Sequence, residues 1–243
     1  MNPHCPHTML PDEPTATEDQ AHTRPGPRPD TAADSGAATA SAASAARKRP
    51  KPGERRIQIL QTLAAMLEQP AGERITTAAL AARLEVSEAA LYRHFASKAQ
   101  MFEGLIEFIE QSVFTLANQI VEREPAEADG AGARQSAIIV RMLLQFAERN
   151  PGMARVMVGD ALVFENERLQ ARMNQFFDKI EATLKQCLRT GADPASHTPS
   201  SDAQVRAAVL SAFVAGRLQR FVRSGFRRLP SEHLDASLAL MLG

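Results

Sequence analysis

From Glu54 onward the hydrophobic residues recur every three to four positions, which is the spacing of amphipathic helices. The first predicted helix begins at Glu54 and ends before Pro70 and Gly72, because proline removes a backbone donor and glycine is a weak helix former. Its apolar positions are Ile57, Leu60, Leu63, Ala64 and Leu67. This pattern predicts one buried and one solvated face.

Two short helices joined by a tight turn are predicted within residues 75–98. Thr76 or Thr77 can cap the first helix and Ser87 can cap the second, because a side-chain oxygen there accepts a free backbone N–H. The positions expected to face inward are Ala78, Leu80, Ala81, Leu84, Val86, Leu91 and Phe95. The second helix then directs another set outward: Ser87, Glu88, Ala89, Tyr92, Arg93 and His94.

A short capped helix that presents hydroxyl, aromatic and basic groups suits the major groove of DNA. The alternative is an ordinary helical hairpin within a globular core. Together with the helix that begins at Glu54, the pair makes a unit of about 45 residues. Such a unit is small for independent stability, so we expect it to dock on a larger domain.

A longer helix is predicted from Ser97 to about Arg123, and at 1.5 Å per residue it would span roughly 35–40 Å. Its apolar stripe is Met101, Phe102, Leu105, Ile106, Ile109, Val113, Leu116 and Ile120. Phe108 lies at the edge of this stripe, beside Glu107 and Glu110. An aromatic side chain there either packs under a neighbouring helix or contacts a partner.

After a loop at residues 124–133, a fifth helix is predicted, and it ends where Asn150 precedes Pro151. Its apolar positions are Ile138, Ile139, Met142, Leu143 and Phe146. A sixth, shorter segment is predicted from Met153 to Phe164, and a final amphipathic segment runs from Leu234 to Leu242.

Two long apolar stripes lie between these segments, separated by a loop over residues 191–201. The first is Leu169, Met173, Phe176, Phe177, Ile180, Leu184, Cys187 and Leu188; the second is Val205, Val209, Ala212, Phe213, Gly216, Leu218, Phe221 and Val222. Two such helices suit a four-helix dimer interface made from two copies of the pair, in which Ala212 and Gly216 allow close approach. The alternative is that both helices are simply core.

Charge is balanced over the 243 residues, with 28 basic and 28 acidic side chains, but its distribution is uneven. Residues 1–46 are rich in Pro, Ala, Ser and Thr, so we expect a disordered tail. Residues 47–56 hold six basic side chains against the single acid Glu54. This arm is either a phosphate contact or a flexible linker.

The sequence offers no basis for an enzyme, because it contains no phosphate loop, zinc-protease motif or nucleophile elbow. Cys5 and Cys187 give neither a disulfide framework nor zinc spacing, and Cys187 lies on an apolar helix face. No membrane span and no secretory signal are predicted. We therefore expect a cytoplasmic protein without metal or cofactor.

The segment Ile75–Lys98 resembles the helix-turn-helix of TetR-type regulators in its Val-Ser turn, its Leu-Tyr-x-His-Phe helix and its Ser-Lys step. The resemblance implies an all-α fold, in which a three-helix DNA-binding unit precedes a larger helical dimerisation and regulatory domain. We therefore expect three parts: a tail at residues 1–46, a basic arm and DNA-binding domain at residues 47–98, and a dimerisation and partner-binding domain at residues 99–243.

The implied DNA-contacting residues, which would fix phosphates or read bases, are Arg55, Arg56, Thr76, Thr77, Ser87, Glu88, Ala89, Tyr92, Arg93, His94 and Lys98. One departure concerns Glu85, which occupies a turn position where the family usually carries glycine. A left-handed backbone at this glutamate would cost on the order of 1 kcal/mol.

Beyond the DNA-binding segment, the chain is similar to members of this family that act in nucleoid occlusion. The matching segments are residues 87–95, 105–110, 148–152, 160–165, 167–175 and 220–224. The resemblance implies a sequence-specific homodimer, with one or more dimers on each double-stranded DNA site. The dimer would associate with the nucleoid and stop septa from forming over it by antagonising the tubulin-like division protein FtsZ.

The implied partner-binding residues are Phe108, Arg149 and Asn150, whereas Leu116 and Gln145 depart from the pattern of that surface. The alternative function is a TetR-type transcriptional repressor that a small-molecule ligand releases from DNA. Residues 134–180 are rich in Met, Phe and Leu, which could line a ligand cavity or fill a core.

Overall fold

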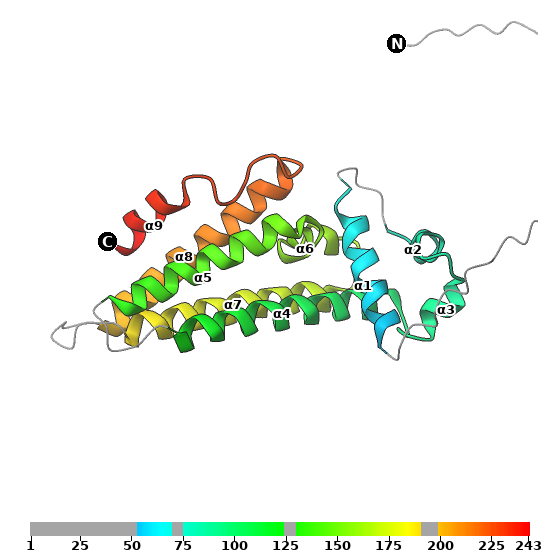
Figure 1. Ribbon diagram of the computed structural model, residues 1–243, viewed down its shortest axis with the longest axis horizontal. Helices are drawn as coiled ribbons and strands as arrows, with labels where there is room; N and C mark the ends of the chain where they lie inside the picture. The colour runs from blue at the N-terminus through cyan, green and yellow to red at the C-terminus, as the bar shows by residue number, and fades with distance from the viewer. Residues whose placement is uncertain (1–52, 70–74, 124–129, 191–198) are drawn as a thin grey trace, which may run out of the picture. The chain divides into compact units, whose positions relative to one another are not determined.

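The computed structural model describes residues 53–69, 75–123, 130–190 and 199–243. Within these ranges all regular secondary structure is helical (Figure 1). The helices are α1 (Glu54–Leu67), α2 (Thr77–Arg83), α3 (Glu88–Tyr92), α4 (Lys98–Arg123), α5 (Ala131–Arg149), α6 (Pro151–Met157), the 3-10 helix η1 (Asp160–Leu162), α7 (Glu167–Thr190), α8 (Pro199–Arg223) and α9 (Leu234–Leu242). The predicted tail, most of the basic arm, Pro70 and Gly72 lie outside the described residues.

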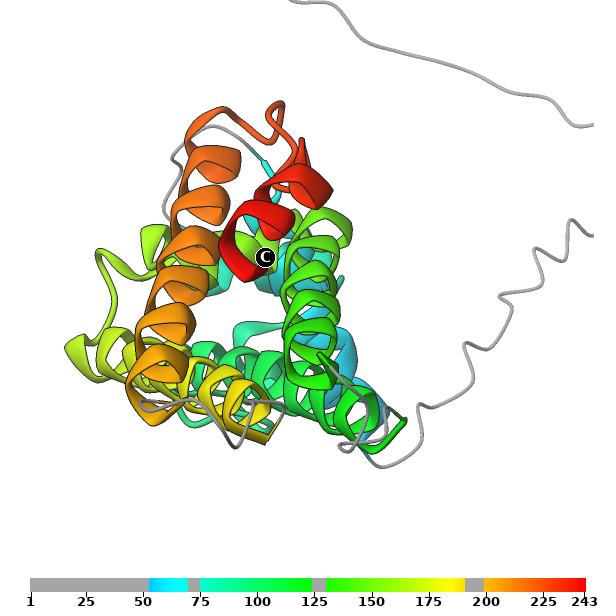
Figure 2. The ribbon, with the colours of Figure 1, turned by 90° about the vertical axis from the view of Figure 1, so that its left-hand side faces the viewer.

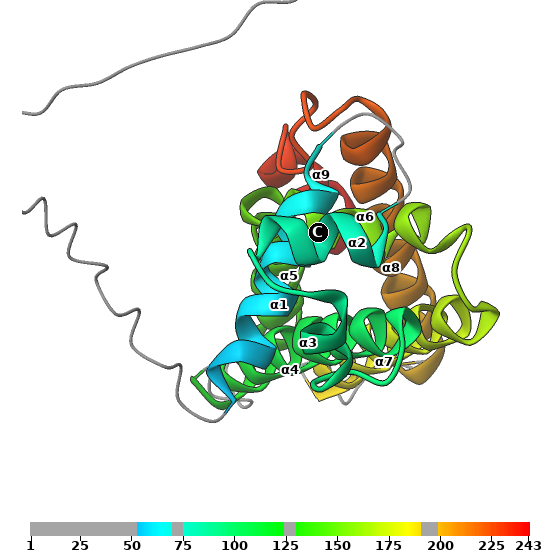
Figure 3. The same ribbon diagram turned by 90° about the vertical axis from the view of Figure 1, so that its right-hand side faces the viewer.

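Helices α1, α2 and α3 gather at one end of the described helices (Figures 1 and 3). They pack through Leu63, Leu80, Leu91 and Phe95, all of which are buried, and α1 also rests on α4 and α6. This docking gives the small unit the additional apolar contact that its size requires.

The long helices α4, α5, α7 and α8 form the rest of the bundle, and α9 lies over α5 and α8 (Figure 2). The pairing of α7 with α8 is the most extensive contact between two described helices. The core between the long helices includes Ile109, Leu143, Phe176 and Leu210, which are buried. The helix predicted at Leu234–Leu242 is confirmed as α9.

The predicted stripe of α4 is confirmed from Met101 to Val113 but wrong at its C-terminal end. Leu116 is 40% exposed, and Ala117 occupies the buried position instead. Leu116 and Ala117 lie three and four residues after Val113, so both continue the helical spacing, and spacing alone does not show which of them faces the neighbouring helices.

The predicted stripe of α5 is correct at Ile139 and Leu143, and Met142 and Phe146 are partly buried and pack against the core, but the prediction is wrong at Ile138, which is exposed. The buried face includes three further positions, Val140, Leu144 and Ala147. Because α5 contacts α4, α6, α7, α8 and α9, its buried face is wider than the predicted stripe.

The short segment predicted from Met153 to Phe164 contains the end of one helix and a second, separate 3-10 helix. Helix α6 ends at Met157, and η1 begins at Asp160. Between them Gly159 adopts a left-handed backbone with φ of 78°. Glycine tolerates this conformation without a steric penalty, so the chain can turn there.

Candidate nucleic-acid and protein interfaces

The two caps of the helix-turn-helix form as the sequence predicts. The Thr76 hydroxyl accepts a hydrogen bond from the Ala79 N–H at 3.1 Å, and the Ser87 hydroxyl accepts one from the Ala90 N–H at 3.3 Å. Glu85, in the turn between the helices, has φ of 54°. This glutamate therefore adopts the left-handed backbone that glycine usually supplies in a tight turn.

Helix α3 separates its residues into an inner and an outer face. Leu91 is buried inside, whereas Ser87, Glu88, Ala89, Arg93 and His94 are exposed. Tyr92 is 46% exposed. The Thr77 hydroxyl donates a hydrogen bond to the Glu88 carboxylate at 2.5 Å, which links α2 to the first turn of α3. The exposed set is short, polar and mixed in charge, as a helix that enters a DNA groove requires.

Three of the expected phosphate contacts are engaged within the chain. The Arg56 guanidinium lies 4.2 Å from the centre of the Phe95 ring and donates to the His94 carbonyl at 3.2 Å. Arg55 donates to the Gln58 side chain at 2.8 Å. The Lys98 ammonium pairs with the Glu165 carboxylate, and both side chains are largely shielded from solvent. Their role in DNA binding stays a prediction.

The predicted partner-binding residues lie on α4 and at the end of α5. Phe108 is 41% exposed, and Arg149 is exposed. Asn150 is half-buried, and its amide donates to the Phe146 carbonyl at 2.7 Å, so it also closes the last turn of α5. Met142 and Arg149 are seven residues apart and share one face of this helix.

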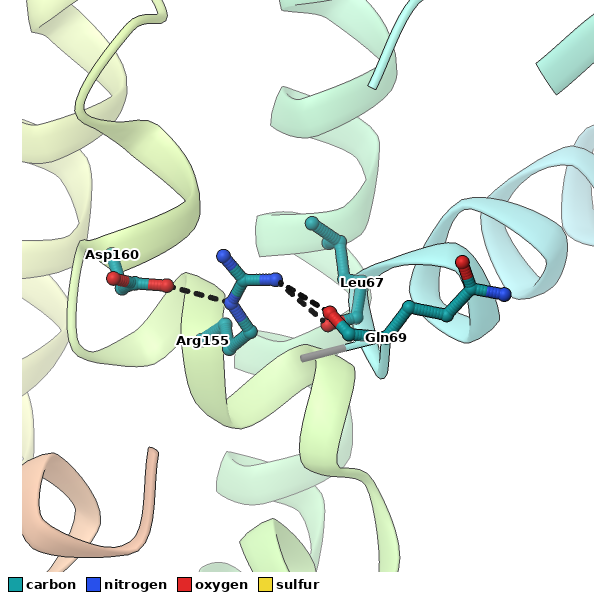
Figure 4. Close-up of polar contacts among 4 residues, drawn as sticks. All are labelled: Leu67, Gln69, Arg155 and Asp160. Atoms are coloured by element: carbon teal, nitrogen blue, oxygen red, sulfur yellow. Dashed lines mark hydrogen bonds and ion pairs between the residues drawn. The ribbon is translucent and has the colours of Figure 1, made fainter. Parts of the chain in front are cut away.

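A link that the sequence did not suggest joins the DNA-binding unit to α6. The Arg155 Nη1 donates to the Leu67 carbonyl at 3.2 Å and to the Gln69 carbonyl at 3.3 Å, at the C-terminal end of α1 (Figure 4). Its Nε donates to Asp160 at 2.6 Å. Arg155 thus satisfies carbonyls that have no partner within α1.

Glycine allows α6 to come close to α1. A Cβ on Gly152 would lie 2.0 Å from the Ala64 carbonyl oxygen and 3.1 Å from the Leu67 Cβ. Only a residue without a side chain fits there. The close approach places α6 and the adjacent end of α5, which carries Arg149, directly behind the DNA-binding unit.

Burial raises the pKa of the Cys187 thiol, which agrees with its prediction as a core residue. Within the described ranges, no group of three or more His, Cys, Asp or Glu side chains is arranged to hold a metal ion. No helix among them is long and apolar enough to cross a membrane.

Known proteins share both parts of this architecture. Residues 59–105 match the description "Bacterial regulatory proteins, tetR family", and residues 133–242 match "Tetracyclin repressor-like, C-terminal domain". The nucleoid occlusion factor SlmA of Idiomarina loihiensis is 51% identical over 187 residues, which cover 77% of this chain and 93% of that protein. The chain belongs to the TetR family, in the group of SlmA.

The SlmA of Vibrio cholerae is 49% identical over 188 residues, which again cover 77% of this chain and 93% of the relative. Among solved structures, the regulator FadR of Bacillus subtilis in complex with stearoyl-CoA superposes with a TM-score of 0.59 at 12% identity, over 77% of this chain and 97% of that one. That likeness concerns the fold alone.

The structure brings together the predicted residues of α2 and α3 at one end, while Phe108, Arg149 and Asn150 belong to α4 and the end of α5. The sequence missed the Arg155 link, because no local pattern indicates a contact with carbonyls 88 and 86 residues earlier. It also missed the exposure of Val163 and Phe164. Gly159 followed by Asp160 could have indicated the break that exposes them.

Proposed function

We propose that this chain is a nucleoid occlusion factor: a sequence-specific DNA-binding homodimer that antagonises the division protein FtsZ, so that septa do not form over the nucleoid. The observation that carries this proposal is the identity of about half of all positions with SlmA proteins over nearly their whole length. Similarity of that extent includes the regulatory helices as well as the DNA-binding unit. The protein would therefore reside in the cytoplasm on the nucleoid.

The geometry of the DNA-binding unit supports the first half of this proposal. Ser87 and Glu88 open the exposed face of α3, which continues through Tyr92 and Arg93. In a helix-turn-helix dimer, two such helices enter successive major grooves about 34 Å apart. Base reading falls to residues 88–93, while Thr76 and Ser87 hold phosphates through hydroxyl and backbone N–H groups. Thr77 contributes its backbone N–H, because its hydroxyl donates to Glu88.

Selection of genomic fragments by the purified protein tests the DNA half of the proposal. We expect sites spread over the chromosome and sparse near the terminus, as an inhibitor of septation over the nucleoid requires. The double variant Tyr92→Ala, Arg93→Ala should lose these sites, whereas Arg189→Ala, at the far end of α7, should keep them. A single site beside one operon would instead favour a local repressor.

The exposed apolar surface of α4 and α5 supports the second half. Phe108, Leu116 and Ile138 are exposed on these neighbouring helices, and Arg149 adds a positive charge at one end. An apolar face with a charged rim is typical of a site for a protein segment. In the region that could have formed a ligand cavity, Met153, Met173 and Phe176 are buried as core. These side chains contribute to the hydrophobic core of the domain.

A sedimentation assay of FtsZ polymers tests the partner half. The protein bound to selected DNA should reduce the polymer pellet, and Phe108→Ala or Arg149→Asp should remove this effect without weakening DNA binding. The control Leu240→Ala changes another exposed apolar residue, on α9, and should act like the unmodified protein. Full activity of both α4–α5 variants would assign FtsZ to another surface.

The outward face of α8 supports the homodimer. Val205, Val209, Ala212 and Gly216 are exposed and recur at a spacing of three to four residues. A Cβ added to Gly216 would meet no other atom, so a second helix can come close there. Two copies of the α7–α8 pair would then form a four-helix interface.

A further inference from the structure

Two strongly exposed apolar side chains are adjacent on the segment between α6 and α7. Val163 is 68% exposed and Phe164 is 76% exposed. They follow η1 directly and precede the first turn of α7, which begins at Glu167. Large apolar side chains that remain exposed together usually mark a contact surface, because their removal from water is favourable.

The segment that carries this pair is fixed at both ends. Asp160 accepts the hydrogen bond from Arg155, and Glu165 pairs with Lys98 at the start of α4. Leu162 is buried between these two anchors. Val163 and Phe164 therefore project from a segment that is anchored on both sides, so its backbone loses little conformational entropy when they bind.

The segment projects on the same side as the open face of α8. In Figures 2 and 3, the connection from α6 to α7 extends past α8, on the side of α8 that faces away from α5. Beside it is an open hollow of about 300 Å³. The hollow is lined by Val158, Val163, Gln219, Val222 and Arg223, among others, so it continues the outward face of α8 toward its C-terminal end.

A projection and a hollow that adjoin on one face are what a two-fold symmetric contact uses. In such a contact the same patch occurs on both subunits, so the projection of each copy reaches the hollow of the other. We propose that Phe164 of each protomer packs into the hollow beside α8 of a second copy of this chain. This inference rests on the proposed α8 dimer and extends that interface toward the DNA-binding unit.

The contact would also govern how the dimer holds DNA. Asp160 and Glu165 tie the segment to α1, through Arg155, and to the start of α4. Fixing this segment against a second copy therefore fixes the separation of the two DNA-binding units. That separation decides the spacing of half-sites that the dimer accepts.

Sedimentation equilibrium of the full chain without DNA measures the contribution of the contact. Phe164→Ser should raise the dimer dissociation constant by at least about tenfold, because a buried aromatic anchor is lost from the interface. Phe164→Leu should stay within about threefold of the unmodified protein, since it retains most of the apolar surface. Leu240→Ser serves as the matched control and should leave the constant unchanged, because Leu240 is exposed on α9.

Cross-linking tests which residues meet. Chains carrying Phe164→Cys are mixed with larger, tagged chains carrying Gln219→Cys, both in a Cys5→Ser background. The mixture is treated with a short bismaleimide at a protein concentration well above the raised dissociation constant that loss of the Phe164 ring should cause. Covalent dimers of the two different chains are expected. Cys187 is buried and should not compete.

The possible outcomes separate this proposal from the one on which it rests. An unchanged dissociation constant for Phe164→Ser, without mixed covalent dimers, overturns the contact. If Val209→Asp dissociates the dimer in the same experiment, the proposal that α8 forms the dimer interface still holds. If Phe164→Ser weakens only DNA or FtsZ binding, the segment serves that partner and the proposal is wrong. A protein that is monomeric at every concentration overturns both proposals.

Discussion

The outer faces of α3 and α8 are both exposed, but their chemistry differs. Helix α3 presents Glu88, Tyr92 and Arg93, whereas α8 presents Val209 and Gly216. Polar and charged groups keep their hydration until they meet another polar surface such as a nucleic acid. Small apolar residues gain most from a second apolar surface that comes close.

The two faces also differ in how they are built. The five-residue helix α3 depends on its Ser87 cap and on Leu91 beneath it, so its orientation comes from a small cluster of contacts. Helix α8 runs from Pro199 to Arg223 and is fixed by α7 along its length. The orientation of α3 therefore depends on fewer contacts than that of α8.

The largest expected effect tests the face of α8. Val209→Asp places a carboxylate on a surface that two copies would bury, and near the symmetry axis the two charges would lie close together. We expect the dimer dissociation constant to rise by about 100-fold or more. Sedimentation equilibrium measures it, with Leu240→Asp as the control. A stable Val209→Asp dimer would remove the basis for contrasting α8 with α3.

The next effect concerns the contact between α6 and α1, which joins the DNA-binding unit to the rest of the helical bundle. In Gly152→Ala the new methyl group would meet the Ala64 carbonyl, so α6 must move away from α1. We expect a loss of about 2–3 kcal/mol in the free energy of unfolding. Thermal or urea denaturation measures it. Gly216→Ala adds the same methyl group where it meets no atom of its own chain, so it should lose less than Gly152→Ala, and any loss that it shows reports the dimer contact.

A smaller effect tests the polar face of α3. Arg93→Ala should weaken binding to selected DNA by about tenfold, roughly 1–2 kcal/mol, as loss of one charged contact predicts. Titration at several salt concentrations distinguishes its two roles. If the slope of the logarithm of the binding constant against the logarithm of the salt concentration falls by about one unit, Arg93 contacts a phosphate. If specificity is relaxed at one base pair, Arg93 reads a base. Unchanged affinity and slope would leave Arg93 outside the interface.

The smallest expected effect concerns the turn before α3. Glu85 has a left-handed backbone, so Glu85→Gly should stabilise the protein by up to about 1 kcal/mol by removing the steric penalty. Differential scanning calorimetry measures the gain as a rise in Tm of about 2–4 °C. Glu85→Ala retains the penalty and should show no such rise. A gain in both variants would point to the charge of Glu85 instead.

Much of the helix-turn-helix could be predicted because its determinants are local. Thr76 and Ser87 cap the helices that follow them, and the spacing of Leu91 and Phe95 selects the inner face of α3. Phe108 stood out by its position off the stripe. The assignment of FtsZ to that surface came from resemblance, because periodicity gives exposure and not the identity of a partner.

The sequence by itself determined the helical class, most helix ends and both caps, since each depends on residues within a few positions. Only the tertiary structure decided which face of α5 is buried, that Leu116 is exposed, and that Arg155 reaches carbonyls 88 and 86 residues earlier. These features depend on where the neighbouring helices lie and how closely they approach. The exposure of Phe164 belongs to this second group, because it follows from the turn at Gly159 and from the two ion pairs that hold the segment.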